Sequence, residues 1–249
     1  MRPRACCVVA HPDDETIFVG GTLAMLADEG FEVHIVSATR GEGGERGDPP
    51  LVTQEGLGAW RERELRCAAH ALGAHGVHFL GYVDPPIGAD GRLFAYTEDL
   101  TELSQRLVRL LTDLNPILIL THGSDGEYGH PAHVVTHRGV LAAHERIRQR
   151  GLRPHLYTFS AAIPGCSDPA FNEADPADVV VDVTPWMRAK AAAAECHRTQ
   201  HALFFRFHPD ASDVLDLLRT QESLHRMYPP DGPDLPVLLQ HRAIWFECG

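Results

Sequence analysis

The sequence predicts an α/β fold in which a mostly parallel sheet is flanked by helices, and three observations support this. Short apolar runs alternate along the chain with longer amphipathic stretches, which is the pattern of strand–helix–strand units. The run ILILT at 117–121 is continuously apolar, as expected for a strand buried on both faces. With 249 residues, 44% of them hydrophobic, the chain can build one substantial core, so a single domain over 1–249 is expected.

The predicted elements follow one another through short turns and a few longer loops. Gly30 and Gly73 provide stops for the first two helices, and Pro185 lies at the start of a later one. Strands are predicted at 4–10, 31–38, 77–80, 117–121, 155–160 and 179–183, and helices at 16–29, 54–72, 97–114, 131–150, 184–201 and 212–226. Loops rich in glycine, proline and polar residues are predicted at 39–53, 81–96, 122–130 and 228–236.

Composition and charge exclude several classes of function. A formal net charge of −12 with neutral histidines argues against a broad basic surface for nucleic acid or anionic lipid. No apolar run approaches the roughly 18 residues of a membrane span, and the apolar stretch before His11 is too short for a signal peptide. We therefore expect a cytoplasmic protein with no nucleic-acid or membrane partner. The six cysteines form no CxxC pair, so no zinc ribbon and no disulfide framework are expected, and several should be buried thiols.

The residues able to carry chemistry follow the predicted strands. Ligands of such sheets bind beyond the carboxyl ends of the strands, and the stretch HPDDE at 11–15 comes directly after the first strand. Its adjacent carboxylates repel one another, and a divalent cation would offset that repulsion. His11 and Asp14 are three residues apart, so they share one face of a helix. His130 and His133 repeat this spacing after a later strand. Together these residues predict a metal site with an open position for water.

Simpler explanations of these residues are also available. An Asp pair at a strand–helix junction is often only a helix cap, and a lone HxxH on a helix often has no function. Glu15 either lies near the metal or caps the helix, with the cap preferred. His122 either lines the pocket or is a hydrogen-bonded residue at a strand end.

Two other kinds of site are disfavoured. The turn after the first strand lacks GxGxxG, and its carboxylates would repel the pyrophosphate of a nucleotide. No GxSxG is present, and Cys6 and Cys7 lie inside a predicted strand rather than at its end. The sequence therefore gives little support to a serine or cysteine nucleophile.

The motif AHPDDE after the first strand, with GHPxH later, resembles the PIG-L/LmbE-like family of metal-dependent N-deacetylases. Other segments agree with the family pattern. They are TRGE at 39–42, RxxEL at 61–65 with the Leu-Gly pair at 72–73, and a D-x-T…K…H-x-[ST]-Q pattern carried by Asp182, Lys190 and 197–200. The resemblance covers residues 5–201, and its first motif is the most specific.

The resemblance implies a Rossmann-like three-layer fold and a zinc ion held by His11, Asp14 and His133. Asp13 would then be the general base that takes a proton from water. The resemblance further implies that His130 stabilises the oxyanion or protonates the leaving amine. Tyr128 matches a tyrosine that polarises the amide carbonyl in some members.

Three more residues are predicted to bind substrate. Arg61 matches an arginine that the family uses in substrate binding. Glu42 and Asp84 lie in the loops at 39–53 and 81–96, which are expected to choose the substrate. The polar character of both loops suits a sugar without identifying one.

One residue departs from the family pattern. Ala132 stands where the family usually has Asp between the two histidines, and that Asp is thought to hold the neighbouring histidine. Without it the protonated form of His130 loses a favourable partner. Either Asp125 or Glu127 takes its place, or the pH optimum and the rate are altered.

The leading hypothesis is a zinc-dependent hydrolase that removes acetyl from an N-acetylated amino sugar or an N-acetylglucosaminyl conjugate. One alternative is a metal-dependent amidase on another conjugate; a phosphoester is disfavoured because two bridged metals need more ligands than the sequence offers. Another is a degenerate metal-binding member, for which Ala132 is the only sign and against which the intact HPDDE argues. Iron, cobalt or nickel can use the same ligands as zinc. A homo-oligomer is compatible with the sequence.

Overall fold

The computed structural model describes residues 2–229 and 243–244 of the chain. The regular elements in chain order are β1 (Arg4–Val9), α1 (Asp14–Asp28), β2 (Glu32–Ser37), α2 (Leu57–Ala71), β3 (Gly76–Phe79), α3 (Leu100–Leu114), β4 (Leu118–Thr121), α4 (Pro131–Gln149), β5 (His155–Phe159), β6 (Ala161–Ala162), β7 (Asn172–Pro176), β8 (Val179–Asp182), η1 (Thr184–Trp186), α5 (Met187–Cys196), η2 (Arg198–Gln200), α6 (His201–Phe207), η3 (Leu215–Leu217), β9 (Gln221–Tyr228) and β10 (Ala243–Ile244). None of the described helices is both long enough and apolar enough to cross a membrane.

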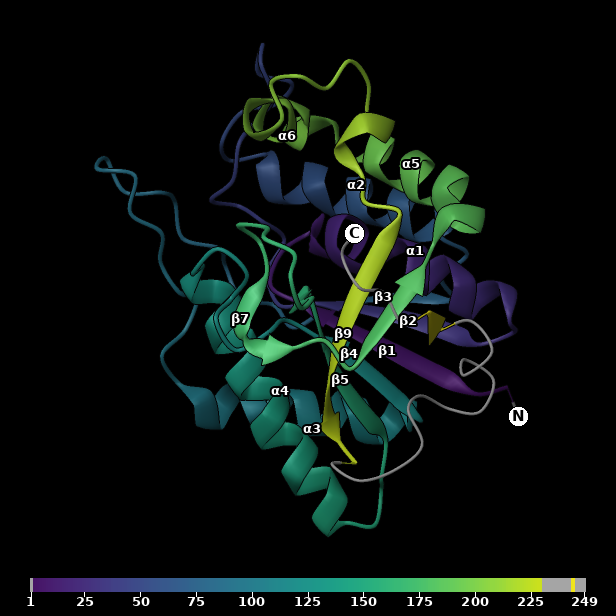
Figure 1. The fold of residues 1–249 in the computed structure, drawn as a ribbon. Coiled ribbons are helices and arrows are strands. Elements are labelled where there is room, and N and C mark those ends of the chain that lie inside the picture. The colour runs from purple at the N-terminus through teal and green to yellow at the C-terminus, as the bar shows by residue number, and fades with distance from the viewer. Residues whose placement is uncertain (1, 230–242, 245–249) are drawn as a thin grey trace.

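The elements form three layers, with the sheet between two groups of helices (Figure 1). The main sheet has the strand order β10-β8-β9-β5-β4-β1-β2-β3, and its strands β3, β2, β1, β4 and β5 are parallel. Strand β9 runs antiparallel between β5 and β8. Helices α1, α2 and α5 lie on one side of the sheet, and α3 and α4 lie on the other. The predicted α/β fold with a mostly parallel sheet is confirmed.

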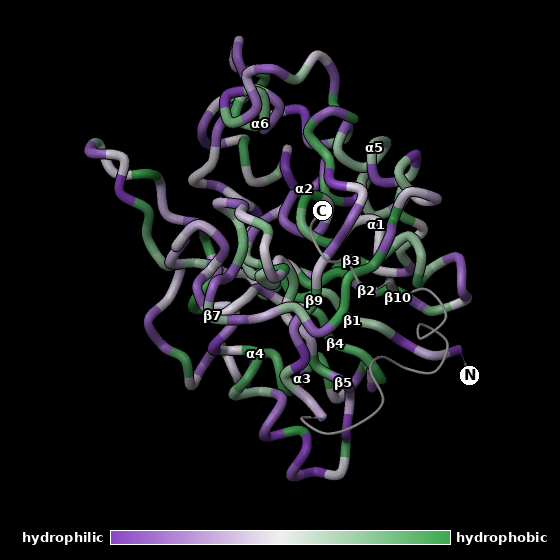
Figure 2. Tube along the Cα trace, in the orientation of Figure 1, coloured by the Kyte–Doolittle hydropathy of each residue, from purple (hydrophilic) through white to green (hydrophobic). Residues whose placement is uncertain are grey.

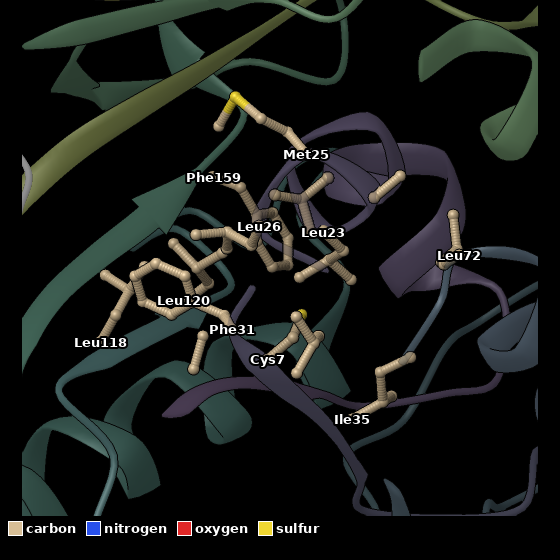
Figure 3. Close-up of a cluster of buried hydrophobic side chains, with 14 of the residues drawn as sticks. Cys7, Leu23, Met25, Leu26, Phe31, Ile35, Leu72, Leu118, Leu120 and Phe159 are labelled. Carbon is tan, nitrogen blue, oxygen red and sulfur yellow. The ribbon is translucent and has the colours of Figure 1, made fainter. Parts of the chain in front are cut away.

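Two hydrophobic clusters hold the layers together, one on each face of the sheet. Because side chains alternate along a strand, the neighbours Cys6 and Cys7 of β1 enter opposite clusters, and both are buried free thiols, as the sequence predicted. The hydrophobic colour in Figure 2 is concentrated along the central strands. Figure 3 shows the cluster beneath α1, where Leu23 and Leu26 pack near Cys7 and Ile35.

A buried ion pair fixes α1 against α5 and β9. Lys190 of α5 donates from Nζ to Glu222 Oε1 of β9 at 2.7 Å, and neither side chain is appreciably exposed. The same carboxylate accepts the backbone N–H groups of Gly21 and Thr22 in the middle of α1, at 2.8 and 2.7 Å. A Cβ at Gly21 would collide with the side chain of Val183, so the helix reaches this depth only because the residue is glycine.

Two predicted helices differ from the structure. The predicted helix at 212–226 is wrong, because 221–228 forms strand β9. Its sequence QESLHRMY contains good helix formers, but hydrogen bonding to strands on both sides overrides that local preference. The predicted helix at 184–201 is interrupted at His197, which leaves helical geometry and turns its ring into the core. The small sheet of β6 and β7 was not predicted, and most of the predicted loop at 228–236 lies outside the described residues.

The expectation of no disulfide is also wrong. Cys67 of α2 is bonded to Cys196 of α5 across a separation of 129 residues, and Cys166 is disulfide-bonded as well. Cysteine spacing along the sequence reveals only local pairs, whereas the packing of α2 against α5 brings these two together. The bond ties the helix that carries Arg61 to the segment that carries His197.

Substitution of the Lys190–Glu222 ion pair tests its contribution to stability. The variant Lys190→Met should lower the free energy of unfolding by about 3–5 kcal/mol, because it leaves the Glu222 charge buried without its partner. Adding Glu222→Gln should recover part of that loss. Urea denaturation of both variants measures this, and a loss below about 1 kcal/mol for the single variant would show that the pair is not the clamp described above.

Candidate metal centre

The parallel strands bring the predicted motifs to one edge of the sheet. The HPDDE stretch at 11–15 follows β1, the loop at 122–130 follows β4, and Asp84 follows β3. Helix α1 begins at Asp14 and α4 begins directly after His130, so the first turns of both helices face the same point. The sheet therefore assembles the site, as the strand-end rule predicts.

Asp14 lies between two histidines at separations that suit a shared cation. Its Oδ1 is 3.3 Å from His133 Nε2, and its Oδ2 is 3.5 Å from His11 Nδ1. Metal–ligand bonds of about 2.0–2.2 Å in a tetrahedral site place neighbouring donor atoms about 3.3–3.6 Å apart. Asp14 therefore stands at ligand-like spacings from each histidine, and a single ion held by all three residues stays a prediction.

Each of the two histidines is held on its far nitrogen by a carboxylate. His11 Nε2 lies 3.1 Å from Asp84 Oδ1, and His133 Nδ1 hydrogen-bonds to Glu127 Oε2. This leaves His133 Nε2 buried and without a hydrogen-bond partner among residues 2–229. An unpaired buried ring nitrogen is costly unless it has another use. A histidine backed by a carboxylate and presenting its other nitrogen is the usual arrangement of a metal ligand.

Two overlapping groups of donor atoms could hold an ion. One is His11, His130 and His133, and the other is Asp14, His122 and His133. His122 is a poor ligand, because its Nε2 accepts the backbone N–H of Ala10 at 3.0 Å while its Nδ1 faces Glu127 at 2.9 Å. Both ring nitrogens are therefore occupied. The alternative that His122 is a hydrogen-bonded residue at a strand end fits the structure better than a pocket-lining role.

The electrostatics of the site favour a positive charge at its centre. Burial alone would lower the pKa of His133, yet the carboxylates of Asp14 and Glu127 raise it to about 10. The pKa of His11 is raised in the same way. Burial alone would lower it, but the carboxylates of Asp84 and Asp14 raise it to about 9. Burial would raise the pKa of Asp14, but the surrounding imidazoles hold it well below its usual range. Protonated imidazoles supply here the positive charge that a bound cation would replace.

Asp13 is close to these donors but is held separately from them. Its backbone has φ 118°, a conformation that non-glycine residues rarely adopt and that costs roughly 1–3 kcal/mol. Glu15 accepts its N–H at 2.9 Å, and Glu15 is itself bonded to the buried His197 at 3.0 Å. Asp13 makes no capping hydrogen bond, so the simple cap explanation fails for it. Burial raises its pKa to about 6, although the Arg61 guanidinium opposes the rise.

Arg61 is a buried clamp on the loops around the site. Its Nη2 donates to the Pro12 carbonyl at 2.6 Å and to Asp13 Oδ2 at 3.2 Å, and its Nη1 donates to the Gly41 carbonyl at 3.0 Å. A Cβ at Gly41 or Gly44 would collide with this guanidinium, which explains the glycines of the loop after β2. Arg61 lines the cavity, but its contacts show it holding Asp13; substrate binding by Arg61 stays a prediction.

His130 and Tyr128 lie at the open side of the site. The His130 ring stacks on His133 with centroids 4.6 Å apart and lies 4.9 Å from His11. Its Nδ1 accepts the Ala132 N–H at 3.1 Å, so the proton of the neutral ring sits on Nε2. Burial and the neighbouring His133 lower its pKa to about 3. Tyr128 is 55% exposed at the mouth of the cavity.

The two loop carboxylates have contacts of their own. Asp84 lines the cavity but is engaged with His11 Nε2. Glu42 accepts the backbone N–H of Asp84 at 3.1 Å, and Arg40 Nε donates to it at 3.1 Å. Glu42 thus ties the loop after β2 to the loop after β3, whereas Glu45 from the same loop lines the cavity. Substrate contacts by Glu42 and Asp84 stay predictions.

The site opens into a cavity of about 360 Å³ with a polar floor and a largely apolar rim. Such a volume lies in the range of small-molecule pockets. The floor is built by His11, Asp13, Asp14, Arg61, Asp84 and His130, and the apolar rim by Ile87, Leu93, Phe94, Leu203 and Phe207. The rim comes from the loop after β3 and from α6, which face each other across the opening.

Three supporting residues carry little signal in the sequence. The family pattern suggests Glu127 only as a replacement for the missing Asp at 132, whereas Glu127 binds the rings of His122 and His133. Asn172 of β7, which holds Glu127, carried no sequence signal. The contact of His197 with Glu15 was signalled only by the HxTQ part of the family pattern. Asp125, the other proposed replacement, accepts the Ala174 N–H instead.

Comparisons with known proteins agree with this geometry. The family profile described as "PIG-L: GlcNAc-PI de-N-acetylase" matches residues 6–144. The chain is similar to the 1D-myo-inositol 2-acetamido-2-deoxy-alpha-D-glucopyranoside deacetylase of Mycobacterium sp. (strain KMS), with 34% identity over 232 residues, 80% of this chain and 74% of the relative. Predicted membership of a deacetylase family is thereby confirmed.

Solved structures show that the fold is shared. N,N'-diacetylchitobiose deacetylase from Pyrococcus horikoshii aligns with a TM-score of 0.65 at 21% identity, over 90% of this chain and 83% of that one. The 4-carboxy-2-hydroxymuconate hydratase of Pseudomonas putida KT2440 aligns with a TM-score of 0.61 at 23% identity, over 94% of this chain and all of the other. Since one of these is a hydratase, the fold by itself does not decide the reaction.

Substitution tests whether His122 belongs to the ligand set, with His133, which both donor groups share, as the reference. His133→Asn should weaken Zn²⁺ binding by more than about 100-fold, because the loss of a ligand costs more than the 10–100-fold typical of a supporting residue. His122→Asn should cost less than that, since its Nε2 is already used by the Ala10 N–H. Competition with a chromophoric chelator measures both affinities. Equal losses in the two variants would move His122 into the ligand set.

Proposed function

The chain belongs to the PIG-L family of GlcNAc-PI de-N-acetylases, and from that premise we propose that it hydrolyses the acetamide of an N-acetylglucosaminyl conjugate at a zinc centre held by His11, Asp14 and His133. The observation that carries the proposal is Asp13. It is fixed next to three convergent donor atoms, in a costly backbone conformation, by Glu15 and Arg61. A carboxylate placed beside a metal site but outside the ligand set suits a general base.

The chain's own residues divide the reaction between them. A zinc ion bound there supplies an activated water and an electrophile for the acetyl carbonyl. Asp13 takes the proton that the attacking water loses. His130 presents its Nε2–H, since its Nδ1 is engaged by Ala132, and that donor stabilises the oxyanion on the acetyl carbon. Asp13 then returns the proton to the nitrogen as the C–N bond breaks, which leaves acetate and a free amine. Tyr128 is placed to contact the acetamide from the mouth.

The cavity supports an amino-sugar substrate. The related deacetylase acts on an N-acetylglucosaminyl inositol, and we propose a conjugate of this class for the present chain. Gly43, Gly44 and Glu45 from the loop after β2 provide a polar wall, and Ile87 and Phe94 from the loop after β3 provide an apolar one. A sugar ring has both polar edges and apolar faces, so these two walls suit it. The two loops predicted to choose the substrate both reach the cavity.

Two further features of the proposal are compartment and assembly. We propose that the protein works in the cytoplasm. A homo-oligomer stays compatible with the proposal.

The base assignment leads to a direct test. Asp13→Asn keeps the shape of the side chain but cannot accept the proton, so kcat should fall by about 10²–10⁴ while zinc stays bound. Asp14→Asn should instead weaken zinc binding itself. Amine release from N-acetylglucosaminyl inositol, before and after chelation, and zinc content per chain are the measurements.

The outcomes separate the alternatives. A zinc-loaded Asp13→Asn variant with the wild-type kcat would exclude Asp13 as the base. A zinc-loaded wild-type protein that releases no amine from N-acetylglucosaminyl inositol or other N-acetylglucosaminyl conjugates would favour either another amide substrate or a degenerate, metal-binding member.

A further inference from the structure

Glu127 is a buried carboxylate with contacts to both sides of the site. It is 3% exposed, and its Oε2 faces the Nδ1 atoms of His122, at 2.9 Å, and of His133. Its Oε1 accepts the Gly123 N–H at 3.0 Å and lies 3.2 Å from Asn172 Nδ2. Both carboxylate oxygens are therefore satisfied, and one of them is shared by two imidazoles.

The loop that delivers Glu127 is held in an unfavourable conformation. Glu127 has φ 60°, a left-handed value that normally favours glycine, and it follows Gly126 at φ 70°. Asn172 of β7 supports this turn by accepting the Glu127 N–H at 3.0 Å, and it is anchored in turn on the carbonyls of Phe159 and Ser160. A charged side chain in such a position persists only where the surroundings fix it.

The contacts of Glu127 fix the tautomers of both rings. Since a carboxylate only accepts, His122 and His133 must each carry a proton on Nδ1. In the neutral form of each ring, the other nitrogen then carries a lone pair. In His122 it accepts the Ala10 N–H, which anchors the end of β1 next to His11. In His133 it is the unpaired Nε2 that lies 3.3 Å from Asp14 Oδ1.

We propose that Glu127 is the positioning residue of the metal centre, setting His133 as a ligand and His122 as a backbone anchor through one carboxylate oxygen. It is the counterpart of Asp84, which holds the far nitrogen of His11. Residue 132, between His130 and His133, is alanine and has no polar side chain for this purpose. The proposal deepens the proposed function and rests on its metal site, but it does not depend on which substrate is used.

The variant Glu127→Gln tests the positioning role of Glu127. Glutamine keeps the size of the side chain but removes the charge and places an amide where two N–H donors converge. Zn²⁺ affinity, measured by competition with a chromophoric chelator, should fall 10–100-fold, as for other residues that hold a metal-binding histidine. Cobalt loaded in place of zinc should show a changed visible absorption spectrum, because the His133 ring is no longer fixed.

Asp175→Asn is the matched control. Asp175 is also buried close by, and it accepts the N–H and hydroxyl of Ser124 and the Thr158 hydroxyl, but it hydrogen-bonds to no imidazole in the part of the chain that the structure describes. Its variant should show a similar change in melting temperature and an unchanged Zn²⁺ affinity and cobalt spectrum. Equal affinity losses in both variants, or none in Glu127→Gln, would reduce Glu127 to a structural loop residue.

A measurement on the unmodified protein guards against a variant that fails to fold. Long-range proton–nitrogen correlation spectra of the metal-free wild type at high pH report the tautomer of each imidazole. Nδ1–H signals from His122 and His133 are expected, and an Nε2–H tautomer of His133 would overturn the proposal. A protein that binds zinc as described but releases no amine would instead contradict the proposed function and leave the role of Glu127 standing.

Discussion

Three consecutive carboxylates at 13–15, largely removed from solvent, are the constraint on which the rest of the site depends. An unpaired charge there would cost several kcal/mol. Each of the three carboxylates is paired with residues from a different part of the chain. Arg61 of α2 forms an ion pair with Asp13. The rings of His11 and His133 lie beside Asp14, and His197 after α5 contacts Glu15. Placing these partners requires α1, α2, α4 and α5 to pack as they do. The fold and the site are therefore specified by the same interactions.

A second level of organisation lies behind the ligands. Imidazoles bind a cation well only when the correct nitrogen is free, and in this chain carboxylates from two different loops make that choice. Asp84 comes from the loop after β3, and Glu127 from the loop after β4. These loops also carry part of the cavity wall. Under the proposed function, a change in either loop would therefore alter both the metal environment and the substrate surface, which would couple specificity to the chemistry.

The sequence predicted what depends on local pattern and on the strand-end rule. Periodicity and topology predicted strands β1 to β5, the loops, and the convergence of HPDDE with His130 and His133. Long-range pairing could not be predicted, because it is decided by tertiary packing. The helix expected at 212–226 is a strand paired on both sides, and Cys67 meets Cys196 only through helix packing. The contacts of Arg61 and Glu127 are equally non-local, so motif matching named the residues without showing what they hold.

The shared fold leaves the reaction to these side chains. A deacetylase and a hydratase both align with this chain along most of its length, and both reactions add water to an electrophilic carbon. A centre that activates water can serve either, so the sheet and the strand-end position do not choose between them. Which reaction occurs therefore depends on the groups that accept the proton and stabilise the developing oxyanion. In the proposed function Asp13 accepts the proton and the Nε2–H of His130 stabilises the oxyanion, an arrangement suited to a carbonyl.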